Sequence, residues 1–213
     1  MKNIVIVGAG GFGREILGYV KDCIDAGSQW VIKGFIDDNL NSLDAYPYNQ
    51  KIISTIKDYI PENDDLFVCA LGLPKIKKAV VESLLSRGAK FATLVHPTAY
   101  MGANVKLGQG VVLCPRVTLT CDILIGNFVM INIASDCGHD AIVGDFATIS
   151  GSCDITGHCQ VGEGSFLASN VAMRPSSKIG KWASVGINSS VILNVKDNQR
   201  VFGNPAIELY VNK

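Results

Sequence analysis

The chain has 213 residues, 48% of them hydrophobic, and its 19 acidic residues balance its 19 basic residues. This balance and the lack of a basic block argue against nucleic-acid binding, which needs a positively charged surface. No run of eighteen apolar residues predicts a membrane span, and the first residues lack the pattern of an export signal. We therefore expect one or two domains in the cytoplasm, with small molecules as partners.

The first hundred residues predict a small α/β unit. An apolar run at 4–7 leads into a glycine-rich segment at 8–15 and then an amphipathic stretch to about residue 26, a pattern typical of a strand, a tight turn and a helix. The elements expected after it are strands at 31–36, 66–71 and 91–95 and a helix at 74–87.

The glycines of this segment, Gly8, Gly10 and Gly13, have the spacing of a dinucleotide-binding turn, and an acidic pair follows at 37–38. A dehydrogenase would need a second mononucleotide half, for which too few residues remain. Backbone N–H groups at a helix start bind any phosphate or diphosphate. A nucleotide-linked substrate therefore fits better, while a turn that only packs the helix on the strand stays an alternative.

From residue 101 to 195 the sequence repeats with a period of six. A compact apolar residue opens each of sixteen hexads, and a second row of mostly small residues, from Val105 to Val195, lies four positions after it. Glycine follows the large residue in half of the hexads, as a chain turning a corner requires. This pattern predicts a parallel β-helix of stacked hexapeptides, without fixing the number of faces.

The seven cysteines contain no Cys-x-x-Cys pair, and three of them (Cys137, Cys153 and Cys159) fall on inward positions of the repeat. Buried cysteine acts as a small hydrophobic residue. We therefore expect neither disulfides nor a metal site.

The repeat resembles the left-handed β-helix of the hexapeptide acyltransferases, in which three hexads close one triangular coil. The resemblance implies about five coils, in which residues eighteen apart are direct neighbours. The expected architecture is thus a Rossmann-like α/β domain at 1–96, followed by a left-handed parallel β-helix with a C-terminal tail at 97–213.

His139 is the best candidate for a general base among the three histidines, because Asp140 can orient its ring or raise its basicity. Gly157, one coil further on, would leave a backbone N–H accessible beside the imidazole for a developing oxyanion. We assign His96 to the junction between the domains and His158 to the solvated surface.

Six motifs occur together and in order, at 8–15, 35–38, 70–72, 94–97, 138–140 and 203–206. With them the chain is similar throughout to the sugar O-acyltransferase and sialic acid O-acetyltransferase family, which contains bacterial nucleotide-sugar 4-amino N-acetyltransferases. The resemblance implies a homotrimer in polysaccharide biosynthesis, with acetyl-CoA between neighbouring prisms. It also implies a UDP- or dTDP-linked amino sugar, of perosamine type, on the α/β domain.

Carried over by position, the resemblance makes His139 the base and Asp140 its acidic neighbour, and places Gly157 at the thioester carbonyl. The positions matching pantetheine contacts are Ser169, Gly186 and Ile187, and those matching sugar-nucleotide contacts are Gly10, Gly11, Phe12, Asp37, Asp38 and Gly72.

The chain departs from the family pattern at two positions. Thr148 stands where some relatives place a second histidine that touches the cofactor, and Ile207 replaces a basic residue of the tail. The cofactor phosphates then need other partners, for which Lys178, Lys181 and Lys196 are candidates.

The predicted reaction is direct acyl transfer, in which the sugar amine attacks the acetyl thioester while His139 takes the proton. An O-acetyltransferase acting on a sugar hydroxyl, such as that of a sialic acid, is the first alternative. A scaffold without catalytic activity is the second.

Overall fold

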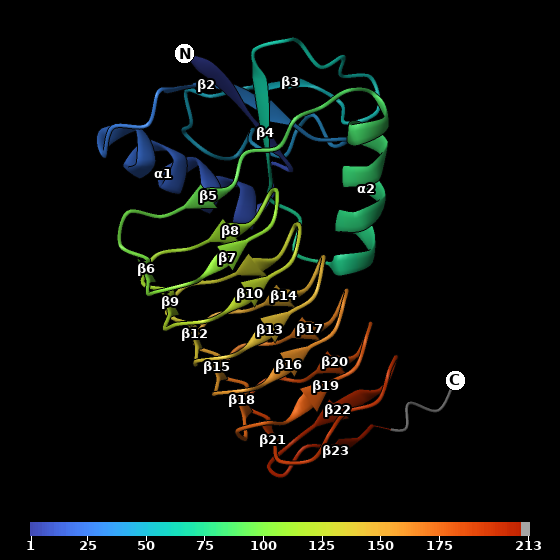
Figure 1. Ribbon diagram of the computed structural model, residues 1–213. Coiled ribbons are helices and arrows are strands. Elements are labelled where there is room, and N and C mark those ends of the chain that lie inside the picture. The colour runs from blue at the N-terminus through green and yellow to red at the C-terminus, as the bar shows by residue number, and fades with distance from the viewer. Residues whose placement is uncertain (210–213) are drawn as a thin grey trace. The chain divides into compact units, whose positions relative to one another are not determined.

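The computed structural model describes residues 1–209 and divides the chain into two compact units, Met1–Pro97 and Thr98–Lys213. The first unit is a parallel sheet of four strands in the order β3-β2-β1-β4, with two helices (Figure 1). Its elements are β1 Lys2–Val7, α1 Gly11–Asp25, β2 Trp30–Ile36, β3 Ile52–Ser54, β4 Asp65–Cys69, α2 Pro74–Ser86 and β5 Leu94–Val95.

These elements confirm the α/β pattern with two corrections. The short strand β3 was not predicted, because its three residues carry no apolar alternation. The strand expected at 91–95 is wrong in extent: Phe91 forms only an isolated bridge to Phe67, and the regular strand is β5.

The strand order creates a crevice at one end of this sheet. β1 lies in the middle, between β2 and β4, so the chain turns to opposite sides after these strands. Ligands of open α/β sheets bind at such a switch point, outside the carboxyl ends of the strands. Fully buried side chains fill the interior, among them Ile4, Ile16, Phe67 and Leu84.

The second unit is a β-helix of short strands, all but one of two residues, on three faces (Figure 1). The first face holds β6 Tyr100–Met101, β9 Thr118–Leu119, β12 Asp136–Cys137, β15 Asp154–Ile155, β18 Ala172–Met173 and β21 Ser190–Val191. The second face holds β7 Lys106–Leu107, β10 Leu124–Ile125, β13 Ile142–Val143, β16 Gln160–Val161 and β19 Lys178–Ile179. The third face holds β8 Val112–Leu113, β11 Met130–Ile131, β14 Thr148–Ile149, β17 Phe166–Leu167, β20 Ser184–Val185, β22 Arg200–Phe202 and the antiparallel β23 Ile207–Glu208.

Successive coils pair in parallel with an offset of eighteen residues, as Cys137 with Ile155. This confirms three hexads per coil and the left-handed parallel β-helix. Both rows of the repeat are buried from Val111 onward. Large residues such as Leu119 and smaller ones such as Ser135 alternate along the chain and together fill the interior of the β-helix.

The prediction that Val195 belongs to the second, smaller row of the repeat is wrong, because the last coil is shorter than the others. Val195 bridges Ile179, and Val201 pairs with Val185, so this coil is two residues shorter than the others. Asn194 closes the shortened coil, because its side-chain oxygen accepts a hydrogen bond from the N–H of Lys178 at 2.9 Å. Val195 therefore continues the column of large residues.

The corners of the coils explain the glycines and correct the reason given for them. A Cβ on Gly138 would lie 2.7 Å from the nitrogen of Gly157 in the next coil, so these glycines allow neighbouring coils to approach. The left-handed conformation falls two residues later, on residues such as Asp140 (φ 60°) and His158 (φ 59°). The turn of the corner is thus made mostly by non-glycine residues.

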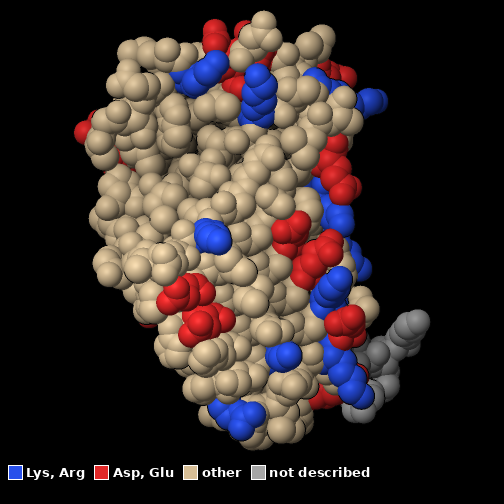
Figure 2. Space-filling view, in the orientation of Figure 1, with Lys and Arg blue, Asp and Glu red and all other residues tan. Residues whose placement is uncertain are grey.

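On the face drawn in Figure 2, basic and acidic side chains are interspersed, and no large area of one sign is visible.

Candidate active site

His139 and Asp140 form a hydrogen-bonded pair at the corner between β12 and β13. Nδ1 of His139 lies 2.8 Å from Oδ2 of Asp140. This contact leaves Nε2 without a hydrogen-bond partner within residues 1–209. An imidazole that donates from Nδ1 to a carboxylate presents an unprotonated Nε2, which can accept a proton. The two residues predicted from the sequence therefore lie together in an arrangement that could act as a general base.

Gly157 faces the free nitrogen from the next coil. A Cβ built on Gly157 would lie 2.6 Å from Nε2 of His139, so only glycine leaves room for the ring in this position. The carbonyl of Gly157 accepts a hydrogen bond from Ser176, whereas its N–H makes no hydrogen bond within the described part of the chain. An N–H beside a base can bind the oxyanion of an acyl-transfer intermediate.

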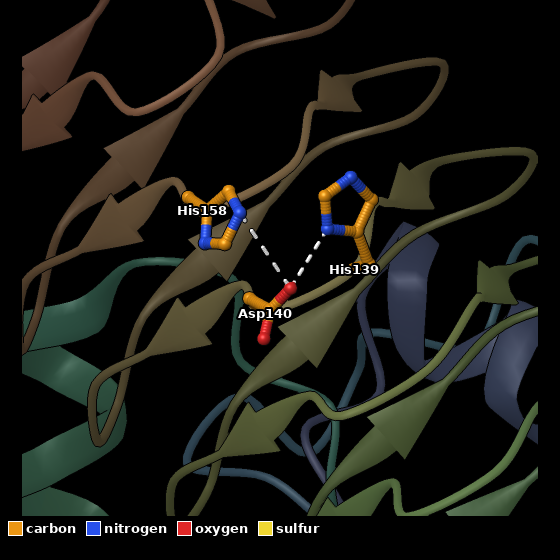
Figure 3. Close-up of side chains that lie close together, drawn as sticks. All are labelled: His139, Asp140 and His158. Carbon is orange, nitrogen blue, oxygen red and sulfur yellow. Dashed lines mark hydrogen bonds and ion pairs between the residues drawn. The ribbon is translucent and has the colours of Figure 1, made fainter.

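His158 also belongs to this cluster, and sequence reasoning missed it. Its Nε2 lies 3.7 Å from Oδ2 of Asp140, and its ring packs edge-on against His139 with ring centres 5.0 Å apart (Figure 3). The side chain is 59% exposed, as expected for a surface residue. The signal that could have found it is the offset of eighteen residues, which puts His158 directly below Asp140.

The carboxylate of Asp140 is held in its ionised form. The hydrogen bond from His139 lowers its pKa below the usual value, and the nearby charge of His158 acts in the same direction. Nδ1 of His139, Oδ2 of Asp140 and Nε2 of His158 lie within 4.8 Å of one another. Two ligands of a tetrahedral zinc ion would lie roughly 3.3 Å apart. The 2.8 Å between Nδ1 and Oδ2 is instead the length of a hydrogen bond.

Three cysteines of the β-helix are poor candidates for a nucleophile. Burial raises the pKa of Cys137 to about 12 and that of Cys153 to about 11. Burial also raises the pKa of Cys121, with Asp122 and Asp140 adding to the effect. Thiols with raised pKa values are not thiolates at neutral pH, and the thiolate is the reactive form.

A second candidate site is a cavity of about 320 Å³ at the crevice of the first unit. The segments that follow β1, β2 and β4 line it, at Gly8, 10–12, Asp37 and 70–73. It therefore brings together five of the six residues predicted to hold a sugar nucleotide. Asp38 does not line it, because its carboxylate accepts a hydrogen bond from the N–H of Ile56 at 3.0 Å.

The glycines around this cavity separate into two kinds. Gly8 has a φ of +98°, and a Cβ on Gly13 would collide with the carbonyl oxygen of Gly8, so the fold itself requires these two. A Cβ on Gly10 or Gly72 would meet nothing within 4 Å. Packing therefore does not explain Gly10 and Gly72, whereas a ligand close to the backbone would.

Helix α1 begins at the cavity without a side-chain cap on Gly10. The first N–H groups of a helix lack partners within the helix and favour an anion. Asp37 shapes the same turn, because its carboxylate accepts hydrogen bonds from the N–H groups of Ala9 (2.7 Å) and Asn39 (2.8 Å). The arrangement offers N–H donors for a diphosphate beside a fixed carboxylate.

Of the predicted cofactor residues, Gly157 lies beside His139, whereas Ser169, Gly186 and Ile187 do not in one copy of the chain. Ser169 follows β17, and Gly186 and Ile187 follow β20, so all three lie at the corner between the third and first faces. His139 and Gly157 lie at the corner between the first and second faces. These two corners are separated by the whole width of the first face.

Thr148 and the three lysines lie in other places. Thr148 is part of β14 on the third face and only 4% exposed. Lys178 and Lys181 line a groove of about 430 Å³ along the second face, of which Lys196 is not part.

Comparison with known proteins shows the family to which this chain belongs. Residues 3–84 match the family model of the PglD N-terminal domain. The chain is 30% identical over 215 residues to GDP-perosamine N-acetyltransferase of Escherichia coli O157:H7, an alignment that covers 96% of this chain and 95% of the relative. The chain belongs to the hexapeptide-repeat nucleotide-sugar N-acetyltransferases. As a member of this family, it is an acyltransferase.

Further relatives of this N-acetyltransferase family support the assignment. UDP-N-acetylbacillosamine N-acetyltransferase of Bacillus subtilis (strain 168) is 31% identical over 117 residues, which cover 53% of this chain and 51% of the relative. WeeI from Acinetobacter baumannii AYE has 27% identity and a TM-score of 0.87, over 98% of this chain and 100% of its own. PerB from Caulobacter crescentus, solved with CoA and GDP-perosamine, has the same fold at 21% identity, with a TM-score of 0.87 over 99% of this chain and 98% of its own.

Within residues 1–209, no helix is long and apolar enough to cross a membrane.

Proposed function

We propose that this chain transfers the acetyl group of acetyl-CoA to the amino group of a nucleotide-linked 4-amino-4,6-dideoxy sugar, with His139 as general base. The observation that carries the proposal is the position of Nε2 of His139, which has no hydrogen-bond partner among residues 1–209 and faces Gly157, while Nδ1 is bonded to Asp140. The relatives named for GDP-perosamine and UDP-N-acetylbacillosamine support an amino sugar as acceptor.

In the proposed step the sugar nitrogen attacks the thioester carbonyl and forms the new C–N bond. The attacking amine becomes acidic as the bond forms, and Nε2 of His139 takes its proton. The N–H of Gly157 donates a hydrogen bond to the developing oxyanion. When the C–S bond breaks, CoA leaves as a thiolate that the protonated His139 can neutralise, so no covalent enzyme intermediate is needed.

The α/β unit is proposed to hold the sugar nucleotide in the cavity that Gly10, Gly11, Phe12, Asp37 and Gly72 line. The N–H groups at the start of α1 suit the diphosphate, as at other helix starts that bind phosphate. Domain 1–96 would thus bind the acceptor and domain 97–213 would carry out the transfer. Asp38 would contribute indirectly, through the segment that it fixes with Ile56.

We also propose a homotrimer, which the separation of the two groups of cofactor residues supports. Ser169, Gly186 and Ile187 lie one face away from His139 and Gly157. One acetyl-CoA touches both groups only if a corner of one prism meets a different corner of a neighbouring prism, as closed cyclic symmetry allows. Thr148, which is 4% exposed in one chain, remains a candidate for a contact with the cofactor, and Lys178, Lys181 and Lys196 remain candidates for its phosphates.

The test is CoA release by the purified protein with acetyl-CoA and GDP-, UDP- or dTDP-linked 4-amino sugars, followed by mass spectrometry of the product. We expect one sugar nucleotide to gain the mass of one acetyl group, which also identifies its base. Release only with hydroxyl sugars or sialic acid would replace the proposal by O-acetylation. A role in polysaccharide synthesis in the cytoplasm is part of the same proposal.

A further inference from the structure

Asp140 has an imidazole on each side, although its role as partner of the base needs only one. Oδ2 lies 2.8 Å from Nδ1 of His139 and 3.7 Å from Nε2 of His158, between the two rings (Figure 3). We infer that His158 is a positioning residue that holds the His139–Asp140 pair in its reactive arrangement. This inference rests on the proposed role of His139 as the base.

The ring of His139 needs support because its side chain is 57% exposed. The torsion that rotates an imidazole about its bond to Cβ is broad, so one hydrogen bond leaves the ring considerable freedom. His158 packs against it nearly at a right angle, 89° between ring planes, with ring centres 5.0 Å apart. This edge-to-face contact favours one orientation of His139, in which Nε2 faces Gly157.

The carboxylate of Asp140 needs support for the same reason, since its side chain is 46% exposed. The 3.7 Å between Nε2 of His158 and Oδ2 is too long for a hydrogen bond, but a small rotation of either side chain closes it. A donor or a positive charge at this place keeps Oδ2 between the rings. It thereby maintains the hydrogen bond that fixes the proton of His139 on Nδ1.

The backbone places residue 158 beside Asp140, but its conformation does not require a histidine at this position. Asp140 and His158 occupy the same left-handed corner position in successive coils, and the N–H of His158 donates to the carbonyl of His139 at 2.8 Å. The neighbouring coils carry Asp122 and Ser176 at this position with the same conformation. The backbone therefore accepts different side chains at 158, so the contacts with His139 and Asp140 are those of the imidazole itself.

Three variants separate positioning from folding. His158→Gly removes the ring and keeps the left-handed conformation, which glycine adopts without strain. His158→Gln keeps an N–H donor at about the distance of Nε2. Ser176→Gly makes the same backbone change one coil away, as the control. We expect His158→Gly to lower kcat about tenfold at unchanged KM for both substrates, His158→Gln to recover most of it, and Ser176→Gly to match the original protein.

The second measurement does not depend on turnover. Long-range proton–nitrogen NMR correlations of the histidines report which nitrogen of His139 carries its proton. We expect the fraction protonated on Nδ1 to fall in His158→Gly and to be maintained in His158→Gln. In an Asp140→Asn background, His158→Gly should have little further effect on kcat.

Either of two results would overturn the inference: a kcat within twofold of the original in His158→Gly, or a lowered kcat with an unchanged His139 tautomer. Failure of the proposed function looks different, because His139→Ala would then retain activity. In that case the tautomer of His139 in His158→Gly still decides whether His158 positions the ring.

Discussion

Gly157 lies directly below His139 in the next coil, where a Cβ would come within 2.6 Å of Nε2. The base and the N–H that would bind the oxyanion are therefore separated by one coil spacing of the β-helix. No loop has to fold over to bring them together. The β-helix thus provides both groups on a rigid element, which favours a fixed geometry.

Gly157→Ala is expected to lower kcat by about 10²-fold or more, because the new methyl group pushes the imidazole away from the reacting atoms. The KM for the sugar nucleotide should not change, since the cavity of the α/β unit is not altered. Steady-state kinetics with each substrate varied in turn checks this. Equal losses in binding and turnover would contradict it.

His139→Ala should lower turnover by roughly 10²-fold or more with little effect on folding, the usual contribution of a general base. Asp140→Asn should have a smaller effect, because the ring remains and only its orientation and basicity change. Single-turnover rates and melting curves of both variants provide the test. If both variants lose the same activity, the carboxylate has a direct part in the reaction.

Gly10→Ala and Gly72→Ala are expected to raise the KM for the sugar nucleotide about tenfold while the KM for acetyl-CoA stays the same. Their new Cβ atoms meet no protein atom within 4 Å but lie at the wall of the cavity. Gly18→Ala is the matched control, since Gly18 is equally free of neighbours and lies outside this wall. Unchanged KM values in both variants would mean that the acceptor binds elsewhere.

Lys77 should make the stability of the protein rise with pH above neutrality. It is 1% exposed, and burial lowers its pKa to about 7. Between pH 7 and the normal lysine value, about 10.4, the unfolded chain binds more protons than the folded one, so stability increases with pH. The shift corresponds to a destabilisation of the folded protein on the order of 5 kcal/mol at low pH. The free energy of unfolding should therefore rise by roughly 2 kcal/mol between pH 7 and pH 9.

Lys77→Met should remove this rise and increase the free energy of unfolding at pH 7. Lys75→Met, on the exposed side of the same helix, should leave the rise intact. Urea unfolding at pH 7, 8 and 9 compares the three proteins. A rise with pH that persists in Lys77→Met would assign it to other groups.

Asp65→Asn is expected to destabilise the α/β unit by about 3 kcal/mol, as loss of one partner of a buried ion pair does. Burial would raise the pKa of Asp65, but hydrogen bonds from Tyr59, the N–H of Glu62 and Lys33 lower it below the usual value. The stabilisation is therefore present above pH 4 and is lost as the pH falls through this lowered pKa. Asp64→Asn, which changes an exposed neighbour, should alter acid unfolding little.

The hexad period was sufficient to predict the β-helix, because each coil repeats one pattern of burial. It could not locate the shortened last coil, since valine at 195 suits either row. In the α/β unit the glycine spacing located the cavity. The hydrogen bond from the N–H of Ile56 to Asp38 could not be predicted, because Ile56 follows β3, a strand that the sequence does not indicate.

The same contrast holds in the candidate active site. The sequence predicted that His139, Asp140 and Gly157 lie together. His139 and Asp140 are adjacent, and Gly157 comes eighteen residues after His139, which places it in the next coil. His158 likewise comes eighteen residues after Asp140, but a histidine at an outward corner is expected to be a solvated surface residue, so its contact with Asp140 was not predicted. Ring packing such as the 5.0 Å contact depends on side-chain torsions, which no period determines.

The left-handed corner position accepts aspartate, histidine, serine, asparagine, phenylalanine and tryptophan with nearly the same backbone angles. Substitution at this position thus leaves the path of the coil unchanged. A mutation can therefore introduce a new side chain at a corner with little effect on stability, because the stability of the β-helix depends on the buried residues of its interior. The side chains beside His139, at the corners of this prism, can therefore change without a change of fold.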